Sequence, residues 1–137
     1  MDSAVARLRF SLARVARLAT ADTDGRPHLV PIVFVVHGSV IYSAVDAKPK
    51  RTTALRRLAN IEANPKVAAL VDDYDDDWSR LWWARADGIG RVLAVGTHES
   101  DRAIDLLAGR YQQYREERPV GPVLAIDVER WSGWSAR

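Results

Sequence analysis

VIYSAVDAKPKRTTALRRLANI, residues 40–61, passes from an apolar run through a basic segment into a helical pattern. Residues 40–45 are apolar and β-branched or aromatic for the most part, which is typical of a strand. Leu55, Leu58 and Ile61 then recur at the spacing of one helix face. This stretch therefore predicts a strand, a tight basic loop and the first turns of a helix.

The basic segment is the most unusual part of this stretch. Its polar side chains are Lys48, Lys50, Arg51 and Thr52, followed by Arg56 and Arg57. Free amide groups at a helix N-terminus attract anions, and nearby cations strengthen that attraction. Cations in a first turn also oppose the helix dipole. The segment therefore binds an anion or is a solvated charged surface, and charge alone favours the second interpretation.

The composition limits the class of protein. The chain has 137 residues, which suits a single domain over 1–137, and its net charge of +2 does not indicate a nucleic-acid-binding protein. It has no Cys, which excludes disulfides and Cys-ligated metals and fits a reducing cytoplasm. No apolar stretch is long enough for a signal peptide or a membrane span. The three His have no zinc-protease spacing, so we expect no metal site. We expect a cytoplasmic protein with neither nucleic-acid nor membrane partners.

The apolar patterns predict a mainly β protein with peripheral helices. Strands are expected over residues 15–21, 27–36, 40–45, 67–71, 81–95 and 123–131, and helices over 3–14, 52–64 and 98–117. Short connections favour antiparallel pairing, and Pro31 marks an edge strand or a bulge. The strand 67–71 is apolar throughout, so we expect both of its faces to be buried. A six-stranded antiparallel barrel is the favoured architecture, and a sandwich is the alternative.

Few residues form a recognisable catalytic motif. The sequence contains neither a dinucleotide-binding glycine motif nor a phosphate-binding P-loop. The Asp residues within 72–77 could serve a two-carboxylate hydrolase, but an acidic loop is more often solvated or in contact with a partner. His28 lies within a predicted strand, where an ordinary sheet residue is favoured over a cofactor or substrate contact.

Five Trp residues are many for a chain of this length. Trp82 and Trp83 point to opposite faces if they lie on a strand, so both faces need to be covered. A second copy of the chain is the favoured cover for one face. The alternative is that one Trp packs under the helix predicted after residue 97.

Three segments together resemble one superfamily. ATADTDGRPHLVPIVF (19–34) is similar to the opening hairpin of the pyridoxamine 5′-phosphate oxidase-like split-barrel proteins. The strand, loop and helix from Tyr42 to Pro65 resemble the segment with which that superfamily binds phosphate. DDYDDDWSRLWWARADG (72–88) is similar to the coenzyme F420-dependent enzymes of actinobacteria.

The resemblance implies a six-stranded, FMN-binding-like split β-barrel that forms a homodimer, with cofactor sites at the dimer interface. It implies an F420-dependent oxidoreductase that transfers a hydride from the reduced deazaflavin to an organic substrate. Carried over residue by residue, it assigns the phosphate to Lys48, Lys50, Arg51 and Thr52, and the preceding small hydroxyl to Ser43. It assigns the ring-lining backbone to Pro31, Ile32 and Val33, and the tail carboxylates to Arg56 and Arg57. Trp78 and Trp83 are candidates to form a pocket wall from the other subunit, and His28 is a further candidate contact.

Several alternatives stay open at this point. Pro49 separates two Lys where FMN-binding relatives have a plain Arg-Lys pair, which favours F420 over FMN as the cofactor. An FMN-dependent oxidase or reductase is the second hypothesis, and a non-catalytic F420- or flavin-binding protein is the third. No catalytic residue can be named, since solvent, His28 or Tyr74 could supply the proton that follows the hydride. The substrate is an unidentified small molecule.

Overall fold

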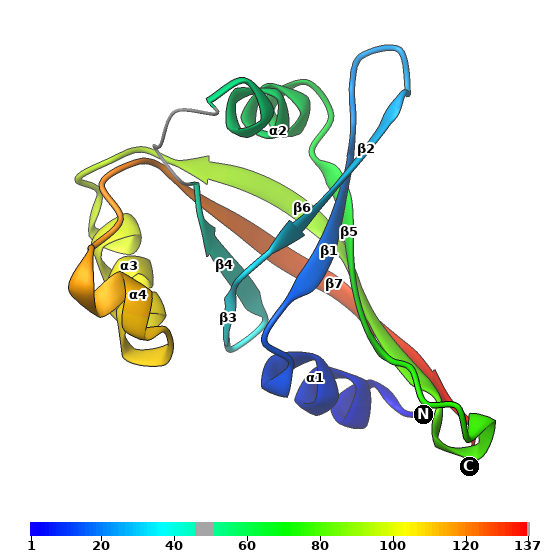
Figure 1. Ribbon diagram of the computed structural model, residues 1–137. Helices are drawn as coiled ribbons and strands as arrows, with labels where there is room; N and C mark the ends of the chain where they lie inside the picture. Colours follow the sequence, from blue (N-terminus) through cyan, green and yellow to red (C-terminus); the bar gives the residue numbers. More distant parts are fainter. Residues whose placement is uncertain (46–50, 137) are drawn as a thin grey trace.

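The computed structural model describes residues 1–45 and 51–136, and within these the side chains of 51–55 are not described. The protein is mainly β, with a single antiparallel sheet in the order β2-β1-β5-β6-β7-β4-β3 (Figure 1). The strands are β1 (Ala16–Ala21), β2 (Pro27–Ile32), β3 (Val35–His37), β4 (Val40–Ala44), β5 (Lys66–Asp73), β6 (Trp82–Leu93) and β7 (Val123–Ser135). The helices are α1 (Ser3–Leu12), α2 (Arg51–Ala63), the 3-10 turn η1 (Trp78–Arg80), α3 (His98–Arg110) and α4 (Gln112–Glu116).

The two edge strands of this sheet are consecutive in the chain. β2 ends at Ile32 and β3 begins at Val35, so one short crossover joins opposite edges and the sheet curls toward closure. The prediction of six strands is therefore wrong: the expected strand over 27–36 is divided, because its first half pairs with β1 and its second half with β4. Pro31 lies in an edge strand, as predicted, where its missing N–H costs no ladder bond.

The inner face of the curled sheet holds the main apolar core. Phe10 of α1 and Phe34 of the crossover are fully buried, with ring centroids 5.0 Å apart. Trp131 of β7 meets Phe10 edge-on at 5.2 Å. In Figure 1, α1 lies below the sheet, α2 lies above it, and α3 and α4 lie to one side. None of the helices in the described ranges combines the length and the apolar character that crossing a bilayer requires.

Helix α1 packs through a different face from the one its sequence indicates. Ala6 and Phe10 are buried, whereas Leu8 and Leu12 are 55% and 70% exposed. Val5, Leu8 and Leu12 recur at helical spacing, but this apolar stripe faces outward. The helix instead buries the Phe10 ring and Ala6, whose small side chain lets the helix lie close to the sheet. Asp2 caps the helix, because its carboxylate accepts a hydrogen bond from the amide of Val5 at 2.9 Å.

Strand β5 is buried on one face only, contrary to the prediction. Val67, Ala69 and Val71 point into the core, whereas Leu70 is 37% exposed on the outer face. An apolar run does not by itself distinguish a strand covered on both sides from one with an uncovered apolar face. The outer face of the sheet consequently carries apolar side chains that no described element covers at this position.

Helix α3 covers the outer face at the β4 side, and a charged network holds it there. Arg91 of β6 donates to Glu99 at 2.9 Å and to Asp127 at 2.7 Å, and the Tyr42 hydroxyl donates to Glu99 at 2.8 Å. Hydrogen bonds from Arg91 and Tyr42 lower the pKa of Glu99 to about 2. Burial and the bond to Glu99 raise the pKa of Tyr42 to about 12. The network therefore keeps Glu99 ionised and Tyr42 neutral at neutral pH.

Candidate functional site

The crossover between β2 and β3 is fixed by side chains from two other elements. The Ser43 hydroxyl of β4 donates to the Val33 carbonyl at 2.8 Å. The Phe34 amide donates to the Tyr111 hydroxyl at 3.1 Å, and the Phe34 carbonyl accepts from Arg110 at 2.7 Å. The backbone groups of the crossover, which lies between the β1–β2 and β3–β4 pairings, thereby have hydrogen-bond partners. These bonds fix the position of residues 31–33, which are predicted to line the cofactor ring.

The predicted residues of this segment differ in exposure. Pro31 is exposed on the outer face, Val33 is half-buried, and Ile32 and Ser43 are buried, with exposed fractions of 4% and 2%. The Ser43 side chain is already used by Val33. A ligand lying along this strand would therefore meet Pro31 and the backbone before it met the Ile32 or Ser43 side chain.

A second group of predicted residues lies near the contact of α2 with β1. Asn60 is buried and donates to the Thr20 hydroxyl at 3.1 Å. His28 is the cross-strand neighbour of Thr20, and Arg57 lies one helical turn before Asn60. Both residues therefore flank the Thr20–Asn60 hydrogen bond.

Two nitrogen atoms in this group are buried without a partner. His28 Nδ1 and Arg57 Nε make no hydrogen bond within the part of the chain that the structure describes. Burial lowers the pKa of the Arg57 guanidinium, an effect that Tyr114 opposes. Burying such groups without a partner costs about 1–3 kcal/mol each, so the arrangement suits an incoming acceptor or anion. Arg56, the neighbouring cation, is exposed.

The strand and the helix on either side of the basic segment follow the order that the sequence predicts. β4 ends at Ala44 and α2 begins at Arg51. Lys48 and Lys50 lie outside the described residues. Arg51 and Thr52 form the start of α2, and their side chains are also outside the description. Their predicted contacts with phosphate stay predictions.

The two predicted Trp residues lie elsewhere in the same chain. Trp83 is on the outer face of β6, three strands from Pro31 in the order β2-β1-β5-β6, or about 14 Å along the sheet. Trp78 belongs to η1, is 69% exposed and donates to the Tyr74 hydroxyl at 3.4 Å. The structure therefore brings neither Trp to the β2–α2 group within one chain. Trp82 faces the opposite side from Trp83, as predicted, and packs against α1, where Arg9 lies 5.2 Å from its ring.

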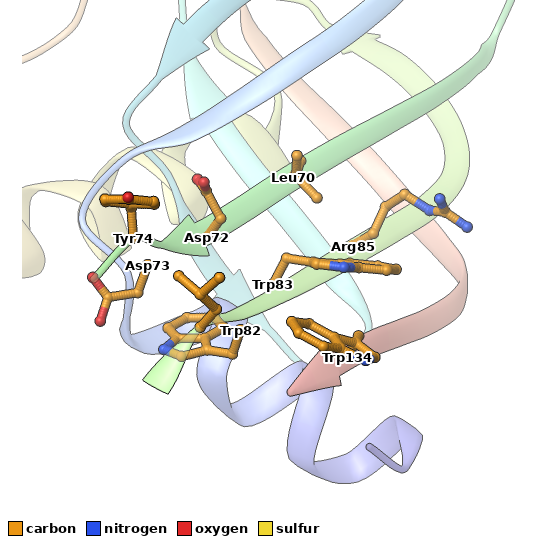
Figure 2. Close-up of a pocket in the computed structure, with 9 residues that line it drawn as sticks. Leu70, Asp72, Asp73, Tyr74, Trp82, Trp83, Arg85 and Trp134 are labelled. Carbon is orange, nitrogen blue, oxygen red and sulfur yellow. The ribbon is translucent and has the colours of Figure 1, made fainter. Parts of the chain in front are cut away.

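Trp83 lines a pocket of about 340 Å³ on the outer face of the sheet (Figure 2). The figure shows the Trp83 and Trp134 side chains next to each other, with Leu70 and Asp72 on the neighbouring strand and Tyr74 beyond. Sequence reasoning did not predict that Trp134 would join this pocket, because that depends on the pairing register of β6 with β7. It also missed Tyr111 and Arg110, although a Tyr in a buried helical stripe signals that its hydroxyl needs a partner.

Comparisons with known proteins match this architecture. The sequence pattern described as pyridoxamine 5′-phosphate oxidase matches residues 3–135. The chain belongs to the pyridoxamine 5′-phosphate oxidase family. A search of curated protein sequences gives no match.

Solved structures share the fold of this pyridoxamine 5′-phosphate oxidase family member. An FAD-binding protein from Mesorhizobium loti superposes with a TM-score of 0.74 at 20% identity, covering 97% of this chain and 94% of that one. A heme storage protein from Vibrio cholerae gives 0.72 at 15% identity, covering 98% and 95%. An FAD-binding protein from Mycobacterium smegmatis gives 0.66 at 16% identity, covering 100% and 98%. At these identities the likeness shows a shared fold alone.

Proposed function

We propose that this protein is an F420-dependent oxidoreductase that binds the anionic part of its cofactor with the β4–α2 segment and with the groups around His28 of β2 and Arg57 of α2. The observation that carries the proposal is a pair of buried nitrogens, His28 Nδ1 and Arg57 Nε, that have no hydrogen-bond partner among the described residues. Arg57 lies on α2, which begins at Arg51, and His28 lies on β2 opposite Thr20 of β1. An anion placed there would satisfy groups that the described protein leaves unsatisfied.

Each part of this region would have its own task. Lys48, Lys50, Arg51 and Thr52 would hold the phosphate, with Arg56 and Arg57 toward the carboxylates of the tail. The backbone of Pro31, Ile32 and Val33 would line the ring, and Ser43 would hold that backbone through Val33. When bound, the reduced deazaflavin supplies the hydride for an electrophilic substrate.

His28 is better placed than Tyr74 to deliver the proton that follows the hydride. It lies on β2 within the proposed cofactor region, whereas Tyr74 lies beyond the end of β5 and is 67% exposed. We therefore propose His28 as the proton source.

The proposed enzyme is a homodimer formed through the outer face of the sheet. Leu29 and Leu70 are 67% and 37% exposed there, and Trp83 and Trp134 continue the same face. The described helices pack elsewhere, because α1 and α2 contribute to the inner core and α3 covers the β4 side. A second copy on this face would cover the apolar residues and bring its Trp78 and Trp83 to the first copy's cofactor region. Sedimentation equilibrium tests this, and a monomer at micromolar concentration would contradict it.

Equilibrium titration of the purified protein with F420, FMN and hemin tests the choice of cofactor. We expect F420 to quench the tryptophan fluorescence at the lowest concentration. Tighter binding of FMN, or a flavin that copurifies, would instead support the FMN-dependent alternative. Tightest binding of hemin would contradict a redox function based on a flavin or deazaflavin. F420 binding without turnover of any electrophile would favour the non-catalytic alternative.

A further inference from the structure

We propose that the outward side of α1 is a docking surface for an anionic lipid bilayer, on which the protein lies without crossing it. Val5, Leu8 and Leu12 form an apolar ridge along this side. The other side of α1 packs on the core within the curled sheet, so the ridge is separate from the outer sheet face that a second copy would cover (Figure 1). The expectation of no membrane partner rests on the missing apolar span, and a helix that lies in a bilayer interface needs no such span.

Helix α1 is apolar on two opposite faces. Ala6 and Phe10 are fully buried on one face, whereas Val5 is 40% exposed on the other and Leu8 and Leu12 are more exposed still. At about 3.6 residues per turn, the centres of these two sets lie nearly opposite each other around the helix. The protein core covers the first face, and the second is left as an exposed apolar surface of the kind that marks an interaction site.

Three cations accompany the ridge. Arg7 lies on one side of the helix and donates to the Gly38 carbonyl at 2.8 Å. Arg9 lies on the other side, with its guanidinium carbon 5.2 Å from the centre of the Trp82 ring, and Arg14, just beyond the helix, stacks on an aromatic ring at 4.8 Å. Within the described part of the chain none of these arginines forms an ion pair with a carboxylate. Their positive charge is therefore available to an anionic partner.

Charge and area together favour a lipid surface. Residues 1–17 contain four Arg and one acidic residue, Asp2, whose carboxylate caps α1. Each Arg near an anionic membrane contributes about fivefold to binding, because its guanidinium group meets lipid phosphates while the apolar side chains enter the acyl boundary. Three side chains on a helix about 15 Å long supply far less than the roughly 800 Å² per partner that a stable protein interface buries. A bilayer needs no such area from one element, since a few inserted apolar groups and nearby cations give weak, reversible binding.

Cosedimentation with lipid vesicles tests this surface. One set of vesicles is phosphatidylcholine alone, and the other contains about 30% phosphatidylglycerol, an anionic lipid. At low salt we expect the protein to bind the anionic vesicles at least about tenfold more tightly, and we expect high salt to weaken that binding. Equal binding to both sets would overturn the proposal. No binding to the anionic vesicles would also overturn it and would leave this face to an acidic protein partner.

A pair of substitutions tests the ridge itself. Leu8→Gln with Leu12→Gln removes two apolar side chains from exposed positions, and we expect at least about a tenfold loss of affinity for the anionic vesicles. The matched control is Val95→Gln with Val120→Gln, which removes two apolar side chains, 64% and 74% exposed, from loops outside α1. We expect the control to stay within about twofold of the unaltered protein. Equal losses in the two variants would refute a docking surface on α1.

A single introduced Cys locates the contact, because the chain has no Cys of its own. The solvent-sensitive dye NBD, attached to the variant Leu12→Cys, should brighten when anionic vesicles are added, since the dye then leaves water for the acyl boundary. The same dye on Val120→Cys, in the loop before β7, should not brighten. No brightening at position 12 would overturn the proposal, and brightening only at position 120 would place the bilayer at the loop that adjoins the end of β4.

Discussion

Replacing Tyr111 with Phe is expected to destabilise the crossover that closes the sheet. The Tyr111 hydroxyl accepts from the Phe34 amide at 3.1 Å and lies 2.9 Å and 3.0 Å from the Phe34 and Arg14 carbonyls. Tyr111 is 6% exposed and Phe34 is fully buried. Removing the hydroxyl therefore leaves the Phe34 amide without a partner in a place that water does not reach.

The expected loss follows from counting the groups that stay satisfied. The Phe34 carbonyl keeps its bond from Arg110 at 2.7 Å, and Arg110 also donates to the Ala13 carbonyl. The variant therefore leaves the Phe34 amide without a partner and loses one hydrogen bond from the Tyr111 hydroxyl to a carbonyl. An unsatisfied buried amide costs about 1–3 kcal/mol, so we expect the free energy of unfolding to fall by about 2 kcal/mol.

Urea unfolding followed by tryptophan fluorescence measures this change. Tyr74→Phe is the matched control, because Tyr74 is 67% exposed and water can replace its hydrogen bond; we expect less than about 0.5 kcal/mol. A loss of less than 0.5 kcal/mol for Tyr111→Phe would refute the claim that its hydroxyl holds the crossover. If the crossover also positions the cofactor, Tyr111→Phe should weaken F420 binding while Tyr74→Phe does not.

Two further changes test the fold around this crossover. The lowered pKa of Glu99, about 2 against 4.5, contributes stability that is complete above pH 4.5 and is lost as the pH falls toward 2. Glu99→Gln should therefore reduce the fall in the free energy of unfolding between pH 4.5 and pH 2. At neutral pH it should cost about 1 kcal/mol, because both side chains of the Arg91–Glu99 pair are 38% exposed and solvent screens them. An unchanged fall at acid pH would contradict this. Gly88→Ala should lower the stability by about 1–3 kcal/mol in thermal unfolding, because a Cβ there would lie 2.3 Å from the Asp127 carbonyl oxygen at the bulge. Gly109→Ala, in open space on α3, should stabilise by about 0.5–1 kcal/mol, and a similar response of the two would refute the steric argument.

Local chemistry predicted most of the elements. The α3 start at Thr97 and the turn at Gly25 follow from caps and turn residues, and the structure has Thr97 accepting from Ser100 and Gly25 at φ +80. The strand over 27–36 could not be divided in advance, because the choice of ladder partner for each half is a long-range property. The outward stripe of α1 was missed for a related reason, since a small Ala can be favoured at a close helix–sheet contact over a larger apolar residue.

The candidate site was predictable only in part. The order of β4, basic segment and α2 follows from residues 40–61, and the position of His28 on an inner strand face follows from alternation. The sequence could not predict that His28 and Arg57 lie near the Thr20–Asn60 hydrogen bond. That prediction needs the register of β1 with β2 and the placement of α2. The row formed by Trp83 and Trp134 likewise required a pairing between segments that lie about fifty residues apart.

The affinity for F420 of a variant that carries Lys50→Ala and Arg51→Ala tests the central claim most directly. The matched control, Arg26→Ala with Lys66→Ala, removes the same charge from exposed positions, one in the β1–β2 turn and one beyond the far end of α2, about 20 Å from its start. We predict that the first variant loses about 2–5 kcal/mol of binding free energy, because two charge-assisted contacts to the phosphate disappear. We predict that the control binds F420 like the unaltered protein. Equal affinity of the first variant and the unaltered protein would contradict an anion site at the β4–α2 segment.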